Sequence, residues 1–208
     1  MSRRRNQIHS SLVSIAILIH LQLISVTVAG DSNATDFIRT SCNDTLYPDV
    51  CYTSLAGYAN AVQQDAAALV TIALTVTLSN AHQMSIYTLN LTRSPDYVSD
   101  RRSTAALRDC VSLFKDAVCQ VRDSIKQMKE LGQTGGGASF ESVRFGLSNV
   151  QTWMSSALTN EDTCIDGFNE VADVGLKMDV CDRSTNVIQV TSNALALVNR
   201  YVDKLLAG

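Results

Sequence analysis

The stretch Ala157-Leu-Thr-Asn-Glu-Asp-Thr-Cys164-Ile-Asp-Gly-Phe168 begins apolar, becomes acidic, and ends with a cysteine, another acid and an aromatic residue. It closes a longer run in which core-type positions recur every three or four residues, the spacing of one face of an α-helix. These positions are Phe140, Val143, Leu147, Val150, Met154, Ala157, Glu161, Cys164 and Phe168. The run predicts a helix with Cys164 on its buried face near the end, and a local break is expected at Asn160 or Thr163.

Three other segments show the same spacing: about Ala59 to Gln83, about Ser103 to Leu131, and about Ser184 to Leu206. Pro95 separates the first two, because proline resists helix continuation. The apolar positions are Val62, Ala66, Leu69, Ala73 and Val76; then Leu107, Cys110, Phe114, Ala117, Val121, Ile125 and Met128; then Val187, Val190, Ala194, Leu197, Tyr201 and Leu205. Four such helices with short connections predict an all-α, up-down-up-down four-helix bundle.

The N-terminus has the layout of a cleaved secretory signal peptide. Arg3, Arg4 and Arg5 precede an apolar run from Leu12 to about Ala29, which ends in small residues. An uncleaved anchor is the alternative, but His20 and Gln22 interrupt the run. We therefore expect a signal peptide over 1–30 and one secreted domain over 31–208, with an N-terminal element at 31–58 and the bundle at 59–208.

Charge and composition narrow the range of partners. Without residues 1–30 the chain loses three arginines and no acid, which leaves 14 basic against 20 acidic residues, a net charge of −6. An acidic domain is poorly suited to nucleic acid, and no membrane association is expected after signal cleavage. The sequons at Asn33, Asn43 and Asn90 are candidate N-glycosylation sites.

Six cysteines, all after residue 30, fit an oxidising compartment. Cys110 lies near the start of the second bundle helix and Cys164 near the end of the third, both on buried faces. If these helices are antiparallel, the two sulfurs meet, so we predict a Cys110–Cys164 disulfide. Cys42 and Cys51 flank a turn around Pro48 and are predicted to form a local disulfide.

Cys119 and Cys181 remain, and they form either a third disulfide or two free thiols. Cys119 is nine positions after Cys110, about half a helical turn round, so it points away from the Cys110 seam.

Catalytic patterns are scarce. His82 is the one histidine after residue 30, too few for a convincing serine or cysteine hydrolase or a zinc site, and no C-x-x-C or G-x-S-x-G motif occurs. We interpret Gly135–Gly137 as a flexible connection between helices. We expect no enzyme activity, no cofactor and no metal, and we interpret the chain as a rigid protein-binding module.

Four motifs in order resemble the plant invertase and pectin methylesterase inhibitor family. They are Cys42-Asn-Asp-Thr-Leu-Tyr-Pro-Asp-Val-Cys51, Ala106-Leu-Arg-Asp-Cys110, Thr152-Trp-Met-Ser-Ser-Ala-Leu-Thr-Asn-Glu-Asp-Thr-Cys164 and Thr191-Ser-Asn-Ala-Leu-Ala-Leu197. The resemblance implies an N-terminal helical hairpin, the two disulfides above, secretion to the cell wall or apoplast, and a one-to-one complex that covers the substrate groove of pectin methylesterase. We expect a monomer when no partner is bound.

The resemblance also implies a contact surface around the Cys110–Cys164 bridge. Thr163 and Asp166 match the family's contact motif, and Asp109 and Glu161 are neighbouring acceptors. Ser112 stands where many relatives have an acid, which puts identical contacts in doubt. The alternative role for Thr163 and Asp166 is to cap or solvate a helix end.

Two other functions compete with this interpretation. Invertase inhibitors commonly carry Pro-Lys-Phe near the start of the third bundle helix, whereas this chain reads Ala138-Ser-Phe140, so pectin methylesterase is the favoured partner. A secreted helical carrier of a lipid or other small ligand would instead need a sizeable internal cavity.

Overall fold

The computed structural model describes residues 32–133, 137 and 139–207, and every regular element in these ranges is helical. Residues 32–42 form a first helical segment. The elements that follow are α2 (Pro48–Leu55), the short 3-10 helix η1 (Ala56–Tyr58), α3 (Ala59–Val62), α4 (Ala66–Leu91), α5 (Pro95–Val98), α6 (Arg101–Gln133), α7 (Phe140–Asp166) and α8 (Val174–Ala207). The predicted all-α class is confirmed.

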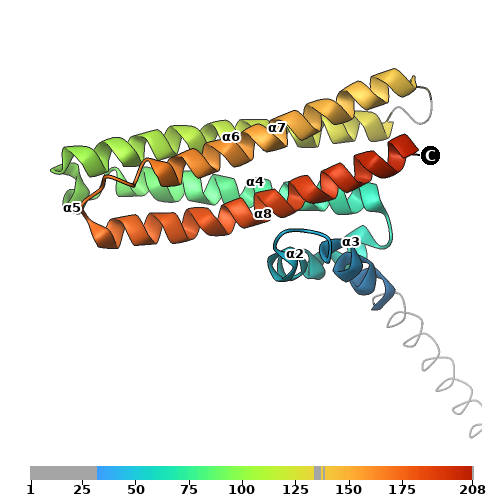
Figure 1. Cartoon of the computed structure of the whole chain (residues 1–208), viewed down its shortest axis with the longest axis horizontal. Helices are drawn as coiled ribbons and strands as arrows, with labels where there is room; N and C mark the ends of the chain where they lie inside the picture. Colours follow the sequence, from blue (N-terminus) through green and yellow to red (C-terminus); the bar gives the residue numbers. More distant parts are fainter. Residues whose placement is uncertain (1–31, 134–136, 138, 208) are drawn as a thin grey trace, which may run out of the picture.

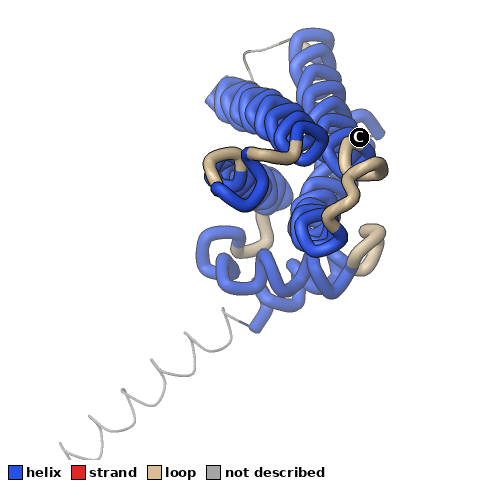
Figure 2. Tube along the Cα trace, turned by 90° about the vertical axis from the view of Figure 1, so that its left-hand side faces the viewer, coloured by secondary structure: helices blue, strands red, loops and turns tan. Residues whose placement is uncertain are grey.

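The four long helices form the predicted up-down-up-down bundle (Figure 1). Helix α6 packs against α4 and α7, and α8 packs against the same two helices. The helices therefore occupy the corners of a square in which α6 and α8 are diagonal. Figure 2 shows the helices in a view along the bundle. The helical segment 32–42 and α2 form the N-terminal hairpin, and α2 contacts both α8 and α4.

Local capping decides where the long helices begin. Helix α4 starts at Ala66 and not near Ala59, because Gln63 adopts a positive φ of 51° and the Asp65 side chain accepts a hydrogen bond from the Ala67 N–H at 2.8 Å. Asp65 thus satisfies one of the N–H groups that a helix start leaves unpaired. Ser139 caps α7 in the same way, through the Ser142 N–H at 3.2 Å.

Helix α7 runs without the break that we expected at Asn160 or Thr163. The Thr163 hydroxyl donates to the Thr159 carbonyl at 2.7 Å, within the helix. The Asn160 amide donates to the Gln120 side chain at 3.0 Å, across to α6. Both polar groups are therefore accommodated without disturbing the backbone. Helix α8 begins ten residues before the predicted start at Ser184.

The core consists of two apolar clusters along the bundle axis. The hairpin-side cluster includes Ile38, Leu74, Val121 and Leu147, and it joins the hairpin to the bundle. The bridge-side cluster surrounds Cys110 and Cys164 and includes the fully buried Leu107, Phe114 and Phe168.

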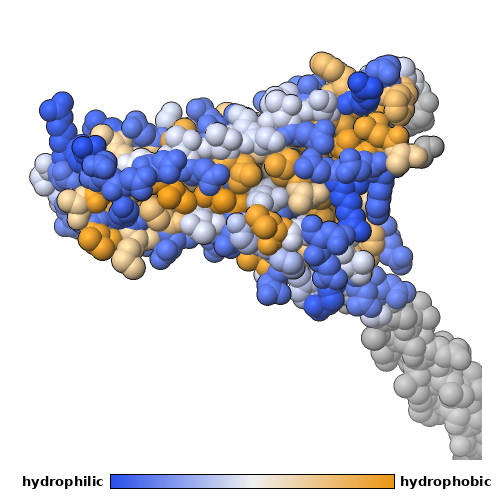
Figure 3. Space-filling view, in the orientation of Figure 1, coloured by the Kyte–Doolittle hydropathy of each residue, from blue (hydrophilic) through white to orange (hydrophobic). Residues whose placement is uncertain are grey.

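Two positions predicted for the buried faces are exposed. Phe140 is 58% exposed and Leu205 is 43% exposed. Each lies within the first or last turn of its helix, where few neighbouring residues remain to cover it. On the face shown in Figure 3, apolar side chains gather near the end of the bundle where α7 begins.

The structure contains the two predicted disulfides. Cys110 and Cys164 join α6 to α7 with a Cα–Cα distance of 4.5 Å, and both are buried. Cys42 and Cys51 join the two arms of the hairpin with a Cα–Cα distance of 5.6 Å.

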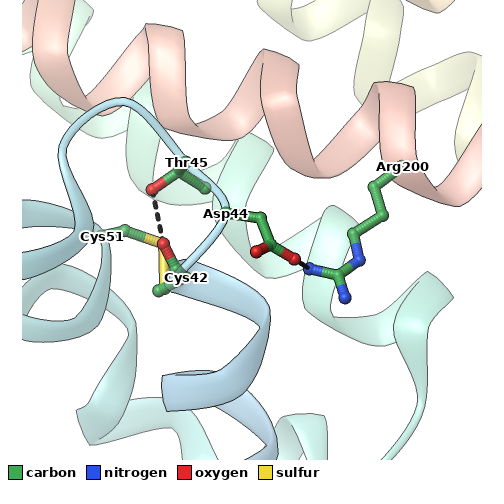
Figure 4. Close-up of polar contacts among 5 residues, drawn as sticks. All are labelled: Cys42, Asp44, Thr45, Cys51 and Arg200. Atoms are coloured by element: carbon green, nitrogen blue, oxygen red, sulfur yellow. Dashed lines mark hydrogen bonds and ion pairs between the residues drawn. A yellow bond between two sulfur atoms is a disulfide. The ribbon is translucent and has the colours of Figure 1, made fainter.

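Polar contacts attach the hairpin to α8. The Asn193 amide accepts from the Tyr47 N–H at 3.1 Å and donates to the Tyr47 carbonyl at 2.9 Å. Asp44 pairs with Arg200, next to the Cys42–Cys51 bond (Figure 4). Because Asn193 is buried, its two-point contact fixes the hairpin turn against the bundle.

The third disulfide, Cys119–Cys181, is not formed, and both residues are free thiols. They lie on α6 and α8, the diagonal pair of helices. The Ser184 hydroxyl is 3.6 Å from the Cys164 sulfur, so Cys181 is near the level of the bridge. Cys119 is nine residues beyond Cys110, about 13 Å further along α6.

We expect the two disulfides to stabilise the protein unequally. In the chain-entropy model, closing a loop of the Cys110–Cys164 length contributes about 4 kcal/mol to stability, against about 2.6 kcal/mol for the nine-residue separation of Cys42 and Cys51. Urea unfolding of the double alanine variants C110A/C164A and C42A/C51A measures both effects. A larger loss from the hairpin pair would contradict this ranking.

Candidate protein-binding surface

The Cys110–Cys164 bond holds the start of α6 to the end of α7 and is itself buried. Phe114 and Phe168 pack around it with no exposed surface. The outward-facing side chains next to these cysteines are therefore presented by two helices that are covalently fixed to each other.

Side-chain contacts show which edges of α6 and α7 meet. Gln120 of α6 donates to the Ser156 hydroxyl at 2.7 Å. Asp109 precedes Gln120 by eleven residues, about three helical turns, and Thr163 follows Ser156 by seven residues, about two turns. Asp109 and Thr163 therefore border the same seam between the two helices.

The structure places four of the five predicted contact residues on the surface around the bridge. Asp109, Ser112, Thr163 and Asp166 are all exposed. We call this group the α6–α7 edge. It offers two carboxylates as hydrogen-bond acceptors and two hydroxyls that both donate and accept.

A residue outside the predicted contact set adds to the acidity of this edge. Asp162 is exposed one helical turn before Asp166. Partial desolvation by its neighbours raises the pKa of Asp162, and the nearby charge of Asp166 raises it further. The i, i+4 spacing of the two acids in the stretch quoted above was the signal that could have revealed this pair.

At the C-terminal end of α7, the hydrogen bonds in the described residues come from the backbone and not from the side chains of Thr163 and Asp166. The Gly167 N–H donates to the Thr163 carbonyl at 3.1 Å, and the Phe168 N–H donates to the Ile165 carbonyl at 3.0 Å. Because backbone groups satisfy these carbonyls, the geometry favours a surface role over a capping role.

The prediction that Glu161 is a contact residue was wrong, whereas its predicted place on the buried face of the helix is confirmed. Its side chain is fully buried, between Ala157 of the hairpin-side cluster and Cys164 of the bridge-side cluster. Helical geometry explains this burial, because Glu161 shares the buried face with Ala157 and Cys164, while Asp162 is rotated about 100° away from it.

Glu161 has an unusual hydrogen-bond environment. The Thr191 hydroxyl donates to Glu161 Oε1 at 3.0 Å and to the Val187 carbonyl at 3.1 Å, and these two acceptors share one hydrogen. Oε2 of Glu161 has no partner. Burial raises the pKa of Glu161 to about 8; the Thr191 hydrogen bond opposes this rise and the charge of Asp162 adds to it. The carboxyl is therefore neutral below about pH 8.

The described ranges hold few of the groups that metal sites and histidine-based catalysis use. No group of three or more His, Cys, Asp or Glu residues there could hold a metal ion. His82 is exposed on α4, and α4 lies diagonally across the bundle from α7. None of the helices in those ranges is both long and apolar enough to cross a membrane.

Known protein sequences resemble this chain over most of its length. The family model described as plant invertase/pectin methylesterase inhibitor matches residues 36–197. The chain is 38% identical over 194 residues to pectinesterase inhibitor 11 of Arabidopsis thaliana, covering 93% of this chain and 94% of that protein. It is 40% identical over 179 residues to pectinesterase inhibitor 10 of the same plant, covering 86% of this chain and 55% of that longer protein.

Solved structures share the fold. The crystal structure of a mutant form of a pectin methylesterase inhibitor from Arabidopsis superposes with a TM-score of 0.58 at 23% identity, covering 76% of this chain and 92% of that one. This likeness supports the helical architecture described above.

We expect Glu161→Gln to change how stability depends on pH. The folded-state pKa of about 8 lies above the ordinary value of 4.5, so the folded protein binds more protons and the parent loses stability as pH rises between these values. The loss approaches about 1.4 kcal/mol per pH unit within this window. Glutamine stays neutral at both pH 5 and pH 8. In urea unfolding, the free energy of unfolding of the variant should therefore rise relative to that of the parent as the pH increases.

The exposed Glu170→Gln substitution is the matched control. This substitution removes a carboxylate from the surface. The difference in the free energy of unfolding between pH 5 and pH 8 should stay close to that of the parent. An identical pH dependence for Glu161→Gln and the parent would show that Glu161 does not titrate as described.

Proposed function

This chain belongs to the plant invertase/pectin methylesterase inhibitor family, and we propose that it is a secreted inhibitor of pectin methylesterase. One copy binds one enzyme molecule through the α6–α7 edge and covers the cleft into which the polysaccharide substrate must enter. Inhibition is then steric, and the inhibitor itself carries out no reaction.

The observation that carries this proposal is the exposed polar edge beside a buried covalent bridge. The side chains of Asp109, Ser112, Thr163 and Asp166 project from helices that the Cys110–Cys164 bond holds together. A surface that is already ordered loses little conformational entropy on binding. The edge is therefore suited to a protein partner that meets a preformed shape.

The chemistry of the edge indicates what the partner provides. Carboxylates at Asp109 and Asp166 accept hydrogen bonds and pair with lysine or arginine. The hydroxyls of Ser112 and Thr163 extend the polar contact. An interface of standard size buries about 1,600 Å² in total, so the partner surface also covers residues beyond these four.

The filled core does not favour a carrier of small ligands. Leu107, Phe114, Leu147, Met154 and Phe168 are almost completely buried along the bundle axis. The hollow lined by Ser41 and Arg200 lies at the surface between the hairpin and α8. A lipid carrier would need a cavity of about 300–1,000 Å³ inside the bundle.

The proposal places the protein outside the cell, in the plant cell wall. Two disulfides fit an oxidising environment. The predicted signal peptide over 1–30 lies outside the described residues.

Titration against purified enzymes tests the function directly. We expect the protein to reduce the activity of a plant pectin methylesterase in a saturable way, with an equivalence point of one inhibitor per enzyme at enzyme concentrations well above Kd. An acid invertase titrated in parallel should keep its activity. Inhibition of the invertase alone would replace this proposal with the other activity in the family name.

Alanine substitutions test whether the α6–α7 edge makes the contact. We expect T163A/D166A to weaken inhibition about tenfold or more, which corresponds to a loss of at least about 1.4 kcal/mol. The matched control is T75A/D182A, which removes two exposed residues of the same types from α4 and α8. Thr75 donates to its own helix at Thr71 as Thr163 does at Thr159.

Thermal unfolding of both variants distinguishes contact from stability. Weaker inhibition with an unchanged Tm supports a direct contact. Full inhibition combined with a lower Tm would return Thr163 and Asp166 to a structural role at the helix end and would remove the edge from the proposal.

A further inference from the structure

A surface groove of about 340 Å³ separates α4 from α8. Its rim carries three side-chain amides, from Asn80 and Gln83 of α4 and from Asn186 of α8. Its floor is apolar, formed by the buried side chains of Met84 and Val187. The volume lies within the range of about 300–1,000 Å³ that ligand sites in proteins occupy.

An ordered polar cluster closes one end of this groove. The Tyr87 hydroxyl donates to Asp179, and Arg183 donates through Nε to the same carboxylate at 2.9 Å. The Arg183 guanidinium lies over the Tyr87 ring, 4.3 Å from its centroid. Although Asp179 holds Nε, the Arg183 side chain is still 55% exposed, so a ligand in the groove can reach its terminal nitrogens.

The sequon Asn90-Leu-Thr92 lies immediately beyond this end of the groove. Asn90 is exposed in the last turn of α4 and follows Tyr87 by three residues, about 4.5 Å along the axis. Asn90 and Gln83, seven residues apart, share one edge of the helix. Side chains on a helix lean toward its N-terminus, so the Asn90 side chain leans back toward Tyr87 and the groove.

We propose that the α4–α8 groove holds the first sugars of an N-linked glycan attached to Asn90. The occupant is thus part of the protein's own covalent structure. The proposal rests on passage through the secretory pathway and does not depend on which enzyme the protein inhibits.

The chemistry of the groove matches these sugars. The first two residues of an N-linked glycan are N-acetylglucosamine, whose hydroxyls and acetamides both donate and accept hydrogen bonds. Amides have the same dual capacity. Asn80 uses Nδ2 on the Val76 carbonyl at 2.8 Å, which leaves its carbonyl oxygen for a sugar donor. Met84 and Val187 provide apolar contact for the acetyl methyl and the ring C–H groups.

The test uses the full chain secreted from a eukaryotic host. An endoglycosidase that cuts between the two N-acetylglucosamine residues is applied to the folded protein, and mass spectrometry follows the Asn90 peptide. We expect cleavage to be about tenfold faster in Q83A/N186A than in the parent, because two hydrogen bonds to the sugars are lost. Thr185 is an exposed neighbour that does not line the groove, so Thr185→Ala should leave the cleavage rate unchanged.

Two controls keep this result interpretable. The Tm of each variant in an Asn90→Gln background reports whether the substitutions loosen the bundle without any glycan. NMR contacts between the acetyl methyl groups of the Asn90 glycan and the Met84 methyl group test the placement without any substitution at the groove, and we expect to observe them.

Several results would overturn the proposal. These are an Asn90 without glycan in the secreted protein, equal cleavage rates in the parent and Q83A/N186A, and the absence of NMR contacts with Met84. Faster cleavage that merely follows a lower Tm in the Asn90→Gln background would also count against it.

Discussion

The Cys110–Cys164 bond is the constraint on which the proposed binding surface depends. It joins the start of one long helix to the end of the next at a point where both are buried. Because α6 and α7 cannot slide or rotate independently at this point, side chains on their shared outer edge keep a constant relationship. The hairpin contacts at Asn193 and Arg200 order the other half of the bundle without touching this edge.

The acidic residues after Ala157 have different environments. Glu161 lies between the two apolar clusters, while Asp162 and Asp166 reach the surface. A carboxyl in the core is costly when charged, and it is tolerated here because burial keeps it neutral at and below neutral pH. The acidity that a partner meets therefore comes from the exposed acids alone.

The square arrangement of the helices separates two surfaces with different chemistry. The α6–α7 edge is acidic and lies on one seam of the bundle. The α4–α8 groove is lined by amides and lies on the opposite seam. A glycan held along the groove would leave the α6–α7 edge open to an enzyme, so the proposed glycosylation and the proposed inhibition are compatible on one small domain.

Periodicity in the sequence was sufficient to predict four amphipathic helices, because a 3.6-residue repeat of apolar side chains is a local property. It was also sufficient to pair Cys110 with Cys164, since antiparallel neighbours bring those positions together. Helix boundaries were predicted less well. The start of α4 depends on the positive φ of Gln63 and the cap at Asp65, and neither changes the apolar pattern.

Tertiary structure decided the features that depend on which helices are neighbours. It placed Cys119 and Cys181 on diagonal helices and at different levels, so they cannot meet. It placed Thr191 against the inward-facing Glu161, and it brought Tyr87 to Asp179, 92 residues apart in the chain. The sequence by itself determined which faces are apolar and which cysteines can meet across adjacent antiparallel helices. Only the packing of four helices into a square determined which polar side chains are buried, which line a groove, and which face solvent, because those outcomes depend on contacts between distant segments.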